Sequence, residues 1–294
     1  MQMVILGHGY SAGALTPRLV AAGWQVTGTT RGDPARVAGA GAAPLIWDGR
    51  ADGPGADALR GVIAGAAALI QSIAPGADGD PVLAGFGDDI VAARPRWIGY
   101  LSTTAVYGDH AGGWVDEDTP PAPASARGAA RVRAERDWLA VAARAGAALH
   151  VFRLAGIYGP GRGPFEKLRG GTARRIIKPG QVFSRIHVDD IAGGLMAALE
   201  RGGPEGGIWN LCDDDPAPPE DVIAHAAGLI GLPLPPAEDF ATAEMTPMAR
   251  SFYGESKRVS NARIKDRLGL RLIHPDYRSG LAAILAAETQ TAGQ

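Results

Sequence analysis

The chain has very little cysteine, since Cys212 is the single one among its 294 residues. One cysteine excludes a disulfide within the chain and is typical of proteins in a reducing compartment. Because Cys212 ends the apolar run Ile208–Cys212, we expect a buried structural thiol. The six histidines are scattered without the spacing of metal ligands, so the sequence predicts no metal site.

The chain also lacks a strong charge of either sign. Its formal net charge is −2, which gives no electrostatic reason to bind nucleic acid or an anionic membrane. The first apolar run is too short for a signal peptide or a membrane span, and no basic segment precedes it. We therefore expect a cytoplasmic protein whose partner is a small molecule, with no nucleic acid and no membrane.

What the chain does contain is a glycine turn near its start. Residues 4–13 read VILGHGYSAG, and the amphipathic segment Ala14–Ala22 follows. A strand, a glycine turn and a helix start in this order seat a dinucleotide pyrophosphate on backbone N–H groups and a helix dipole. The first glycine allows the tight turn, the second the approach of the phosphates, and the alanine close helix–strand packing. The predicted cofactor-binding residues of this turn are Gly7, Gly9, Tyr10, Ser11 and Ala12.

Strand and helix patterns alternate along the first half of the chain. The alternation predicts an α/β fold, a Rossmann-type doubly wound parallel sheet. From Gly159 to Gly180 the chain is rich in Gly, Pro and Arg without periodicity, which marks the end of the cofactor domain. We expect a dinucleotide-binding domain over residues 1–160 and a smaller C-terminal α/β substrate lobe over 161–294, with the segment near 185–212 returning to the sheet. The expected strands are Met3–Leu6, Gln25–Thr29, Ala43–Trp47, Ala67–Ile73, Arg96–Leu101, Leu149–Leu154 and Ile208–Leu211, and the expected helices include Ala14–Ala22, Ala56–Ile63, Val82–Ala93 and Ala129–Ala145.

A series of short motifs runs through the chain in a fixed order. The motifs are GHG at 7–9, LSTTAVYGD at 101–109, VDEDTP at 115–120, RLAGIYGPG at 153–161, HVDD at 187–190, WNL at 209–211, SNAR at 260–263 and LGL at 268–270. Together they resemble the extended short-chain dehydrogenases/reductases, the epimerase/dehydratase group. The resemblance covers nearly the whole chain and implies a nicotinamide cofactor.

The chain departs from that family where its catalytic Tyr-x-x-x-Lys pair belongs. The flanking segment PASA at 123–126 is present, but Arg127 stands at the Tyr position and Arg131 at the Lys position. A guanidinium, with a pKa above about 12, cannot exchange a proton near neutral pH as the family tyrosine does. We therefore expect the family's usual acid–base catalysis to be absent.

Two interpretations of this arginine pair stay open. Both side chains can be solvated charges on a helix face that also carries Arg133 and Arg136. Alternatively, their i, i+4 spacing gathers two like charges around an anion, either the substrate or the cofactor. Arg131 would then bond the nicotinamide ribose as the family lysine does, and Arg127 would stabilise developing negative charge.

The resemblance implies roles for several further residues near the strand ends. Thr103 matches the family's catalytic Ser/Thr, although a strand-end hydroxyl can equally cap the next turn. Tyr107 and Tyr158 are the nearest tyrosines that could supply a proton, but we expect both to be packing residues. The cofactor contacts implied in this region are Ser102, Gly156 and Ile157.

The end of the second predicted strand bears on the choice of cofactor. Family enzymes that use NAD place Asp or Glu there to accept from the ribose 2′-hydroxyl. This chain has Thr30 at that position and Arg31 after it. A guanidinium and hydroxyls suit a 2′-phosphate, so NADP(H) is favoured over NAD(H). The resemblance also implies that Asp48 contacts the adenine amine and that residues Ile73, Ala74 and Pro75 line the ribose and pyrophosphate.

The substrate class is less well defined by the sequence. Two groups that hold a sugar-nucleotide diphosphate in the family are replaced by Gly156 and Phe183, which argues against that class. His187 and Asp190 are expected to be structural, as a helix N-cap with a packed imidazole. Five basic residues of the following segment form either an anion site or a solvated loop: Arg162, Arg174, Arg175, Lys178 and Arg185.

The sequence thus predicts an NADP(H)-binding, atypical short-chain oxidoreductase or epimerase-like protein that acts on a small substrate, with an anion as one candidate. Its reaction would depend on hydride transfer, with Thr103 orienting the substrate. The alternative is a non-catalytic NADP(H)-binding regulatory or scaffold protein that kept the pocket. The family resemblance also favours a homodimer.

Overall fold

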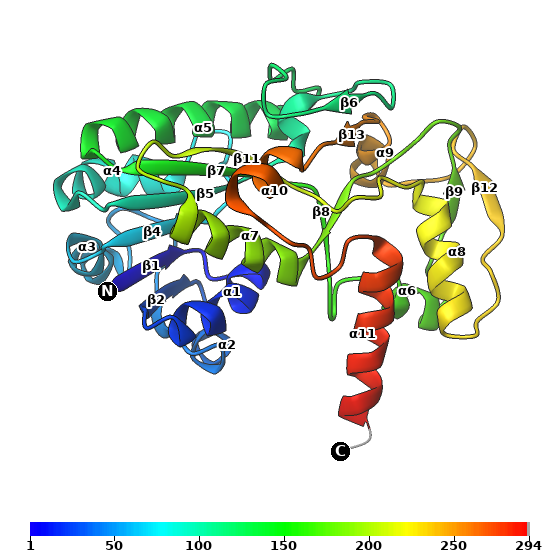
Figure 1. Ribbon diagram of the computed structural model, residues 1–294, viewed down its shortest axis with the longest axis horizontal. Coiled ribbons are helices and arrows are strands. Elements are labelled where there is room, and N and C mark those ends of the chain that lie inside the picture. Colours follow the sequence, from blue (N-terminus) through cyan, green and yellow to red (C-terminus); the bar gives the residue numbers. More distant parts are fainter. Residues whose placement is uncertain (293–294) are drawn as a thin grey trace.

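The computed structural model describes residues 1–292 and has a mixed α/β architecture around one seven-stranded sheet (Figure 1). The strand order is β11-β7-β5-β4-β1-β2-β3, and every neighbouring pair is parallel. The chain winds outward in both directions from β1 and β4, which confirms the doubly wound parallel sheet. The strands are β1 (Gln2–Leu6), β2 (Gln25–Thr30), β3 (Ala43–Ile46), β4 (Ala68–Gln71), β5 (Trp97–Thr103), β7 (Ala148–Leu154) and β11 (Gly207–Leu211).

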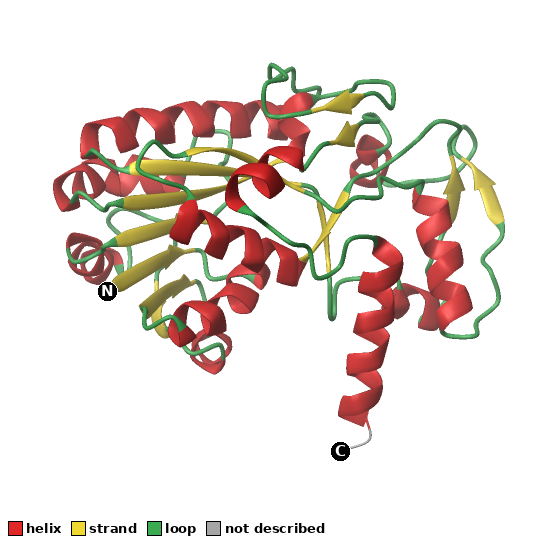
Figure 2. Cartoon of the chain, viewed as in Figure 1, coloured by secondary structure: helices red, strands yellow, loops and turns green. Residues whose placement is uncertain are grey.

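Helices cover both faces of the sheet (Figure 2). One face carries α1 (Tyr10–Ala21), α2 (Pro34–Gly39), α7 (Val188–Arg201) and α10 (Ala262–Leu268). The other carries α3 (Ala56–Ala64), α4 (Pro81–Ala93) and α5 (Ala126–Ala145). Within residues 1–292, no helix has the length and apolar character needed to span a bilayer.

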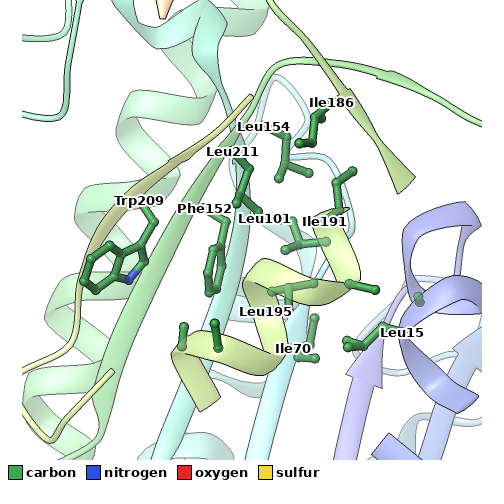
Figure 3. Close-up of a cluster of buried hydrophobic side chains, with 14 of the residues drawn as sticks. Leu15, Ile70, Leu101, Phe152, Leu154, Ile186, Ile191, Leu195, Trp209 and Leu211 are labelled. Atoms are coloured by element: carbon green, nitrogen blue, oxygen red, sulfur yellow. The ribbon is translucent and has the colours of Figure 1, made fainter. Parts of the chain in front are cut away.

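Side chains of the central strands alternate between two apolar cores. In β1, Met3 and Ile5 enter the core under α1 and α7, whereas Val4 and Leu6 enter the core under α3, α4 and α5. Because helices cover these strands on both faces, the side chains on both sides of each strand are buried, and the sequence of such a strand is a continuous hydrophobic run. Figure 3 shows the first core, where α1 and α7 pack on the sheet through Leu15, Leu195, Ile70, Leu101 and Phe152.

A smaller lobe lies beyond the carboxyl ends of the strands (Figure 1). A third apolar core lies in this lobe and joins α6 (Phe165–Arg169), α8 (Pro219–Leu229) and α11 (Tyr277–Ala292). The strand β11 returns to the main sheet beside β7, within the segment for which the sequence predicts this return. The remaining elements are β6 (Trp114–Val115), β8 (Gly156–Tyr158), α6 (Phe165–Arg169), β9 (Arg175–Ile177), β10 (Arg185–His187), α8 (Pro219–Leu229), β12 (Ala237–Asp239), α9 (Pro247–Phe252), β13 (Arg258–Val259) and α11 (Tyr277–Ala292).

Two helices begin earlier than the sequence pattern predicts. Helix α1 starts at Tyr10 instead of Ala14, because the chain turns into the helix directly after the N-cap Gly9. Helix α5 starts at Ala126 instead of Ala129, because the Ser125 hydroxyl accepts a hydrogen bond from the third helical N–H and caps the helix. In both cases a glycine in the first helical turns lowers the local helix propensity and hides the start.

A buried histidine in β7 makes the fold sensitive to acid. His150 accepts the indole N–H of Trp209 at 3.0 Å, and burial lowers the pKa of the imidazole to about 4. The unfolded chain binds this proton near pH 6.5 and the folded chain only near pH 4, so stability present above pH 6.5 is lost as the pH falls. The shift corresponds to about 3 kcal/mol in the free energy of unfolding.

We therefore expect the loss of stability between pH 7 and pH 4 to be smaller by about 3 kcal/mol in His150→Phe than in the unmodified protein. Urea denaturation at a series of pH values measures the difference. The variant also leaves the indole N–H of Trp209 without its acceptor, so its stability at pH 7 is the reference for each comparison. Parallel pH profiles for the two proteins would contradict the assignment.

Candidate cofactor and active site

The glycine turn after β1 is held by the neighbouring strands and leaves open space in front of it. Gly7 adopts φ +86°, and a Cβ there would lie 2.6 Å from Cγ1 of Ile73, so this position requires glycine. Its N–H donates to the Thr29 hydroxyl at 2.7 Å. At Gly9, by contrast, a Cβ would meet no atom of the described residues closer than the Gly7 carbonyl at 3.9 Å.

The start of α1 provides the groups that an anion needs. The N-cap Gly9 has no side chain, and no other side chain of residues 1–292 caps this helix. The first-turn N–H groups of Tyr10 and Ser11 therefore face an open space at the positive end of a twelve-residue helix. This arrangement fits the pyrophosphate of a dinucleotide, as the sequence predicts for this turn.

His8 supports the turn from beneath. Its ring is buried against Gly28, where a Cβ would lie 2.6 Å from the imidazole. The Thr16 hydroxyl donates to the Ala12 carbonyl at 2.8 Å, so the 2.8 Å contact between His8 Nε2 and that hydroxyl makes Nε2 the donor. Burial and the nearby Arg36 lower the pKa of His8, which keeps the ring neutral.

Two guanidinium groups lie near the end of β2. The Thr30 hydroxyl accepts from the N–H groups of the following turn, and Arg31 is exposed, with no ion pair to any residue of 1–292. Arg36, which the sequence analysis missed, donates to the His8 carbonyl at 2.5 Å and pairs with Asp33 at 3.6 Å. The signal was the Asp33-Pro34 helix start, which brings the first turn of α2 back toward the glycine turn.

The remaining predicted cofactor contacts follow β3 and β4 at the same edge of the sheet. Asp48 is exposed and accepts from the N–H of Arg50 at 2.9 Å. Ile73 donates its N–H to the Gln71 side chain at 3.1 Å, which fixes the start of the segment Ile73–Pro75. Ligands of open α/β sheets bind at this carboxyl edge, where the strand order reverses.

A cavity of about 1210 Å³ opens between this edge and the smaller lobe. It brings together eight of the predicted site residues: Tyr10, Ser11, Ser102, Thr103, Arg127, Arg131, Gly156 and Ile157. The other predicted residues are outside its lining, at the carboxyl edge or in the first turn of α1: Gly7, Gly9, Ala12, Thr30, Arg31, Asp48, Ile73, Ala74 and Pro75.

Arg127 and Arg131, which the sequence resemblance places at the family's Tyr and Lys positions, both border the cavity. Helix α5 can approach the segment after β5 because Gly128 has no side chain: a Cβ there would lie only 2.8 Å from the Ala105 carbonyl. Arg131 is half-buried and donates to the Leu101 carbonyl at 2.6 Å. Arg127 is exposed, and its guanidinium lies 5.2 Å from the ring centre of Phe252 in α9. Both guanidinium groups therefore lie at the cavity, and Arg127 is also exposed to solvent.

A buried ion pair fixes the end of β5. The Ser102 hydroxyl donates to Glu135 at 2.5 Å, and Glu135 pairs with Arg153 at 2.8 Å. These two charged side chains are only 10% and 3% exposed. The adjacent Thr103 lines the cavity, and its hydroxyl accepts from the N–H of Ala105 at 3.2 Å. Ser102 and Thr103 both line the cavity, but the Ser102 hydroxyl is bonded to Glu135, whereas the Thr103 hydroxyl bonds only the N–H of Ala105.

Several family motifs meet in one hydrogen-bond network behind the cavity. The Tyr107 hydroxyl donates to the Asn210 side chain at 2.7 Å, and burial raises the pKa of this tyrosine to about 12. The Asn210 N–H donates to Glu117, and its amide donates to the Ser260 carbonyl. Tyr158 donates to the Asp276 carbonyl at 3.3 Å, and its pKa is also raised by burial. Both tyrosines have packing roles, which fits the expectation.

The basic residues after β8 divide into paired and unpaired groups. Arg174 forms an ion pair with Glu238, Lys178 donates to the Tyr253 carbonyl, and Arg185 donates to two backbone carbonyls. Arg175 lies outside the cavity lining, whereas Arg162 lies in it, with its guanidinium 5.6 Å from the ring centre of Tyr10.

The HVDD motif has a structural geometry at the start of α7. His187 caps this helix by accepting the N–H of Asp189, and Asp190 accepts the N–H groups of Ile273 and His274. His187, Asp189 and His274 bring potential ligand atoms within 4.8 Å of one another. The Nδ1 lone pair of His187 is already used by the cap, which disfavours metal binding there.

Comparisons with known proteins show the family to which the chain belongs. The sequence model of the NAD dependent epimerase/dehydratase family matches residues 90–212. Protein YeeZ of Escherichia coli K12 is 31% identical over 290 residues, covering 94% of this chain and 97% of YeeZ. The chain belongs to the NAD-dependent epimerase/dehydratase family. A 3-diazoavenalumate denitrifying reductase from a Streptomyces species is 32% identical over 186 residues, covering 57% of this chain and 58% of the relative.

Two solved structures show how widely the fold is shared. A conserved protein of unknown function from Silicibacter pomeroyi is 56% identical, with a TM-score of 0.89 over 97% of this chain and 98% of its own. The human epimerase family protein SDR39U1, solved with NADPH, is 19% identical, with a TM-score of 0.71 over 97% of this chain and 99% of its own. The second likeness shows the fold alone.

Proposed function

We propose that the protein is an NADP(H)-dependent oxidoreductase that acts on a small anionic substrate without the family's tyrosine acid. The observation that carries the proposal is that the glycine turn and the cavity form one continuous site. The uncapped start of α1 at Gly9 adjoins the cavity through Tyr10 and Ser11, and Thr103, Arg127 and Arg131 line the same cavity.

The residues of the chain have separate roles in this proposal. A bound nicotinamide supplies hydride transfer. Arg131, fixed by the Leu101 carbonyl, bonds the ribose beside it, in place of the family lysine. Thr103 orients the reacting oxygen, and Arg127 stabilises negative charge that develops on the substrate. Tyr107 and Tyr158 are buried and their hydroxyls are bonded elsewhere, and we propose that the proton that a tyrosine supplies in the family comes from water.

Two comparisons support the reductive chemistry and the cofactor. The Streptomyces relative is named a reductase, and structures of the same fold contain NADPH or NAD, which is in line with a nicotinamide dinucleotide. The alternative, a cofactor-binding regulatory or scaffold protein, predicts binding without turnover. We also propose that the protein works in the cytoplasm on a small molecule, with residues 1–160 as cofactor domain and 161–294 as substrate lobe. We propose further that it forms a homodimer. Size-exclusion chromatography with light scattering can check the oligomeric state.

The proposal is tested by two measurements on the same preparation. NADPH fluorescence on titration with the protein gives the dissociation constant, and its loss after addition of keto acids and unsaturated acids reports hydride transfer. Arg131→Ala should weaken NADPH binding, whereas Arg133→Ala, an exposed arginine on the same helix outside the cavity lining, should not. Absence of NADPH binding would refute the proposal, and tight binding without transfer to any acceptor would favour the regulatory alternative.

The choice between the two dinucleotides depends on the guanidinium groups near the end of β2. Arg31→Ala is expected to weaken NADPH binding by about 1.5–3 kcal/mol, the range for a hydrogen bond to a charged group, and to leave NADH binding nearly unchanged. Arg36→Ala should have a smaller effect, because this side chain already bonds the His8 carbonyl and Asp33. Paired titrations with NADPH and NADH measure both. Tighter NADH than NADPH binding by the unmodified protein would overturn the assignment.

A further inference from the structure

The charged side chains that line the cavity are almost all cations. Seven of them are Arg or Lys: Arg127, Arg131, Arg162, Lys167, Arg174, Arg185 and Lys257. The lining contains no Asn, Gln, His or Asp among the described residues. Its one carboxylate is Glu255, which pairs with Lys257 at 2.6 Å. Serine, threonine and tyrosine hydroxyls also line the cavity, so the feature that distinguishes it is its excess of positive charge, which favours an anionic ligand.

One part of the wall formed by the smaller lobe is apolar and aromatic. Phe183 and Tyr253 pack edge to face with ring centres 5.6 Å apart. The short helix α9 adds Met248 and Phe252, which are 67% and 50% exposed although both are large and apolar. Aromatic rings and thioethers together accommodate a flat apolar body. Side chains of this kind left open beside a cavity are typical of a ligand-binding wall.

Among the described residues, Arg127 is one of the cavity cations without an anionic partner. Arg127 lies over the ring of Phe252 and forms no ion pair with any residue of 1–292. Of the other cavity cations, Lys257 pairs with Glu255 and Arg174 with Glu238, whereas Arg131 and Arg185 bond only neutral partners and Arg162 lies over the ring of Tyr10. A guanidinium that is unpaired and borders a cavity matches the planar, two-oxygen geometry of a carboxylate.

From this combination we infer that the substrate is an aryl or conjugated carboxylic acid. Its carboxylate binds Arg127, and its flat body lies against Phe252, Tyr253 and Phe183, which follow one another along the wall. The inference rests on the proposed function, because it assigns the substrate of that same cavity. It goes beyond it by naming the class of anion, a flat and largely apolar acid, which the experiment compares with a sugar acid.

The test is calorimetric titration of the full chain, with and without saturating NADPH, using three probes. These are trans-cinnamate, its uncharged analogue cinnamamide, and glucuronate, which has a carboxylate on a hydroxyl-rich body. We expect cinnamate to bind at least tenfold more tightly than either other probe. Arg127→Gln should reduce cinnamate to the affinity of the amide, and Arg133→Gln should change nothing. Phe252→Ala should weaken acid and amide by a similar factor.

Each other outcome identifies what has failed. Equal binding of cinnamate and cinnamamide, glucuronate binding as tight as cinnamate, or no binding of cinnamate to protein that binds NADPH would overturn the substrate class and leave the proposed function standing. Cinnamate binding that is selective and lost in Arg127→Gln, in a protein that does not bind NADPH, would support the acid site and refute the proposed function. A preference for cinnamate that survives in Arg127→Gln would remove this arginine from the assignment.

Discussion

Gly9→Val is expected to weaken NADPH binding by more than about 100-fold, or roughly 3 kcal/mol, while the protein stays folded. The backbone at Gly9 has φ −97°, which a valine adopts without strain, and a Cβ there meets no atom within 3.9 Å. The isopropyl group therefore projects into the open space before the start of α1, where the phosphates are expected to bind. Fluorescence titration with NADPH measures the loss, and thermal unfolding confirms that the fold is retained.

The matched control for this variant is Gly13→Val, in the same helix. A Cβ at Gly13 also meets nothing within 4 Å, but this position lies a turn further along α1, away from the helix start. Valine has a slightly better helix propensity than glycine, so the free energy of unfolding should change by less than about 1 kcal/mol and NADPH affinity should stay unchanged. Unchanged NADPH affinity in a folded Gly9→Val protein would remove the glycine turn from the cofactor site, and with it the basis of the proposed function.

Glu135→Ala is expected to lower the free energy of unfolding by about 3–5 kcal/mol. The substitution leaves the guanidinium of Arg153, which is only 3% exposed, without its partner, and the Ser102 hydroxyl without its acceptor. Urea denaturation measures the loss. Arg136→Ala is the control, because it breaks a pair with Asp137 that is open to solvent, and it should change the free energy of unfolding by less than about 1 kcal/mol.

A double variant distinguishes the cost of a stranded charge from the cost of lost packing. In Glu135→Leu with Arg153→Met, apolar side chains replace both charges, and most of the lost stability should return. A loss below about 1 kcal/mol in Glu135→Ala would show that water reaches Arg153 in solution. Failure of the double variant to recover stability would instead show that the shape of the pair, more than its charge, supports the end of β5.

The sequence predicted the features of this protein that depend on local pattern. Apolar runs such as Met3–Leu6 become strands because both sides of the sheet are covered, and a glycine turn between a strand and a helix has few alternative geometries. The position of Arg36 depended on a short helix, α2, that the alternation of longer elements did not predict. The contact of Arg127 with Phe252 joins distant parts of the chain, so no local pattern could show it. The limits of the two lobes stay a prediction.

The way α5 begins has a consequence for substitutions at position 127. The Ser125 cap and the close approach of Gly128 to the Ala105 carbonyl hold this helix end without help from the side chain at 127. An exposed side chain at such a place can change from a phenol to a guanidinium with little effect on folding. A substitution at position 127 should therefore change what the cavity binds or does with little change in the stability of the fold.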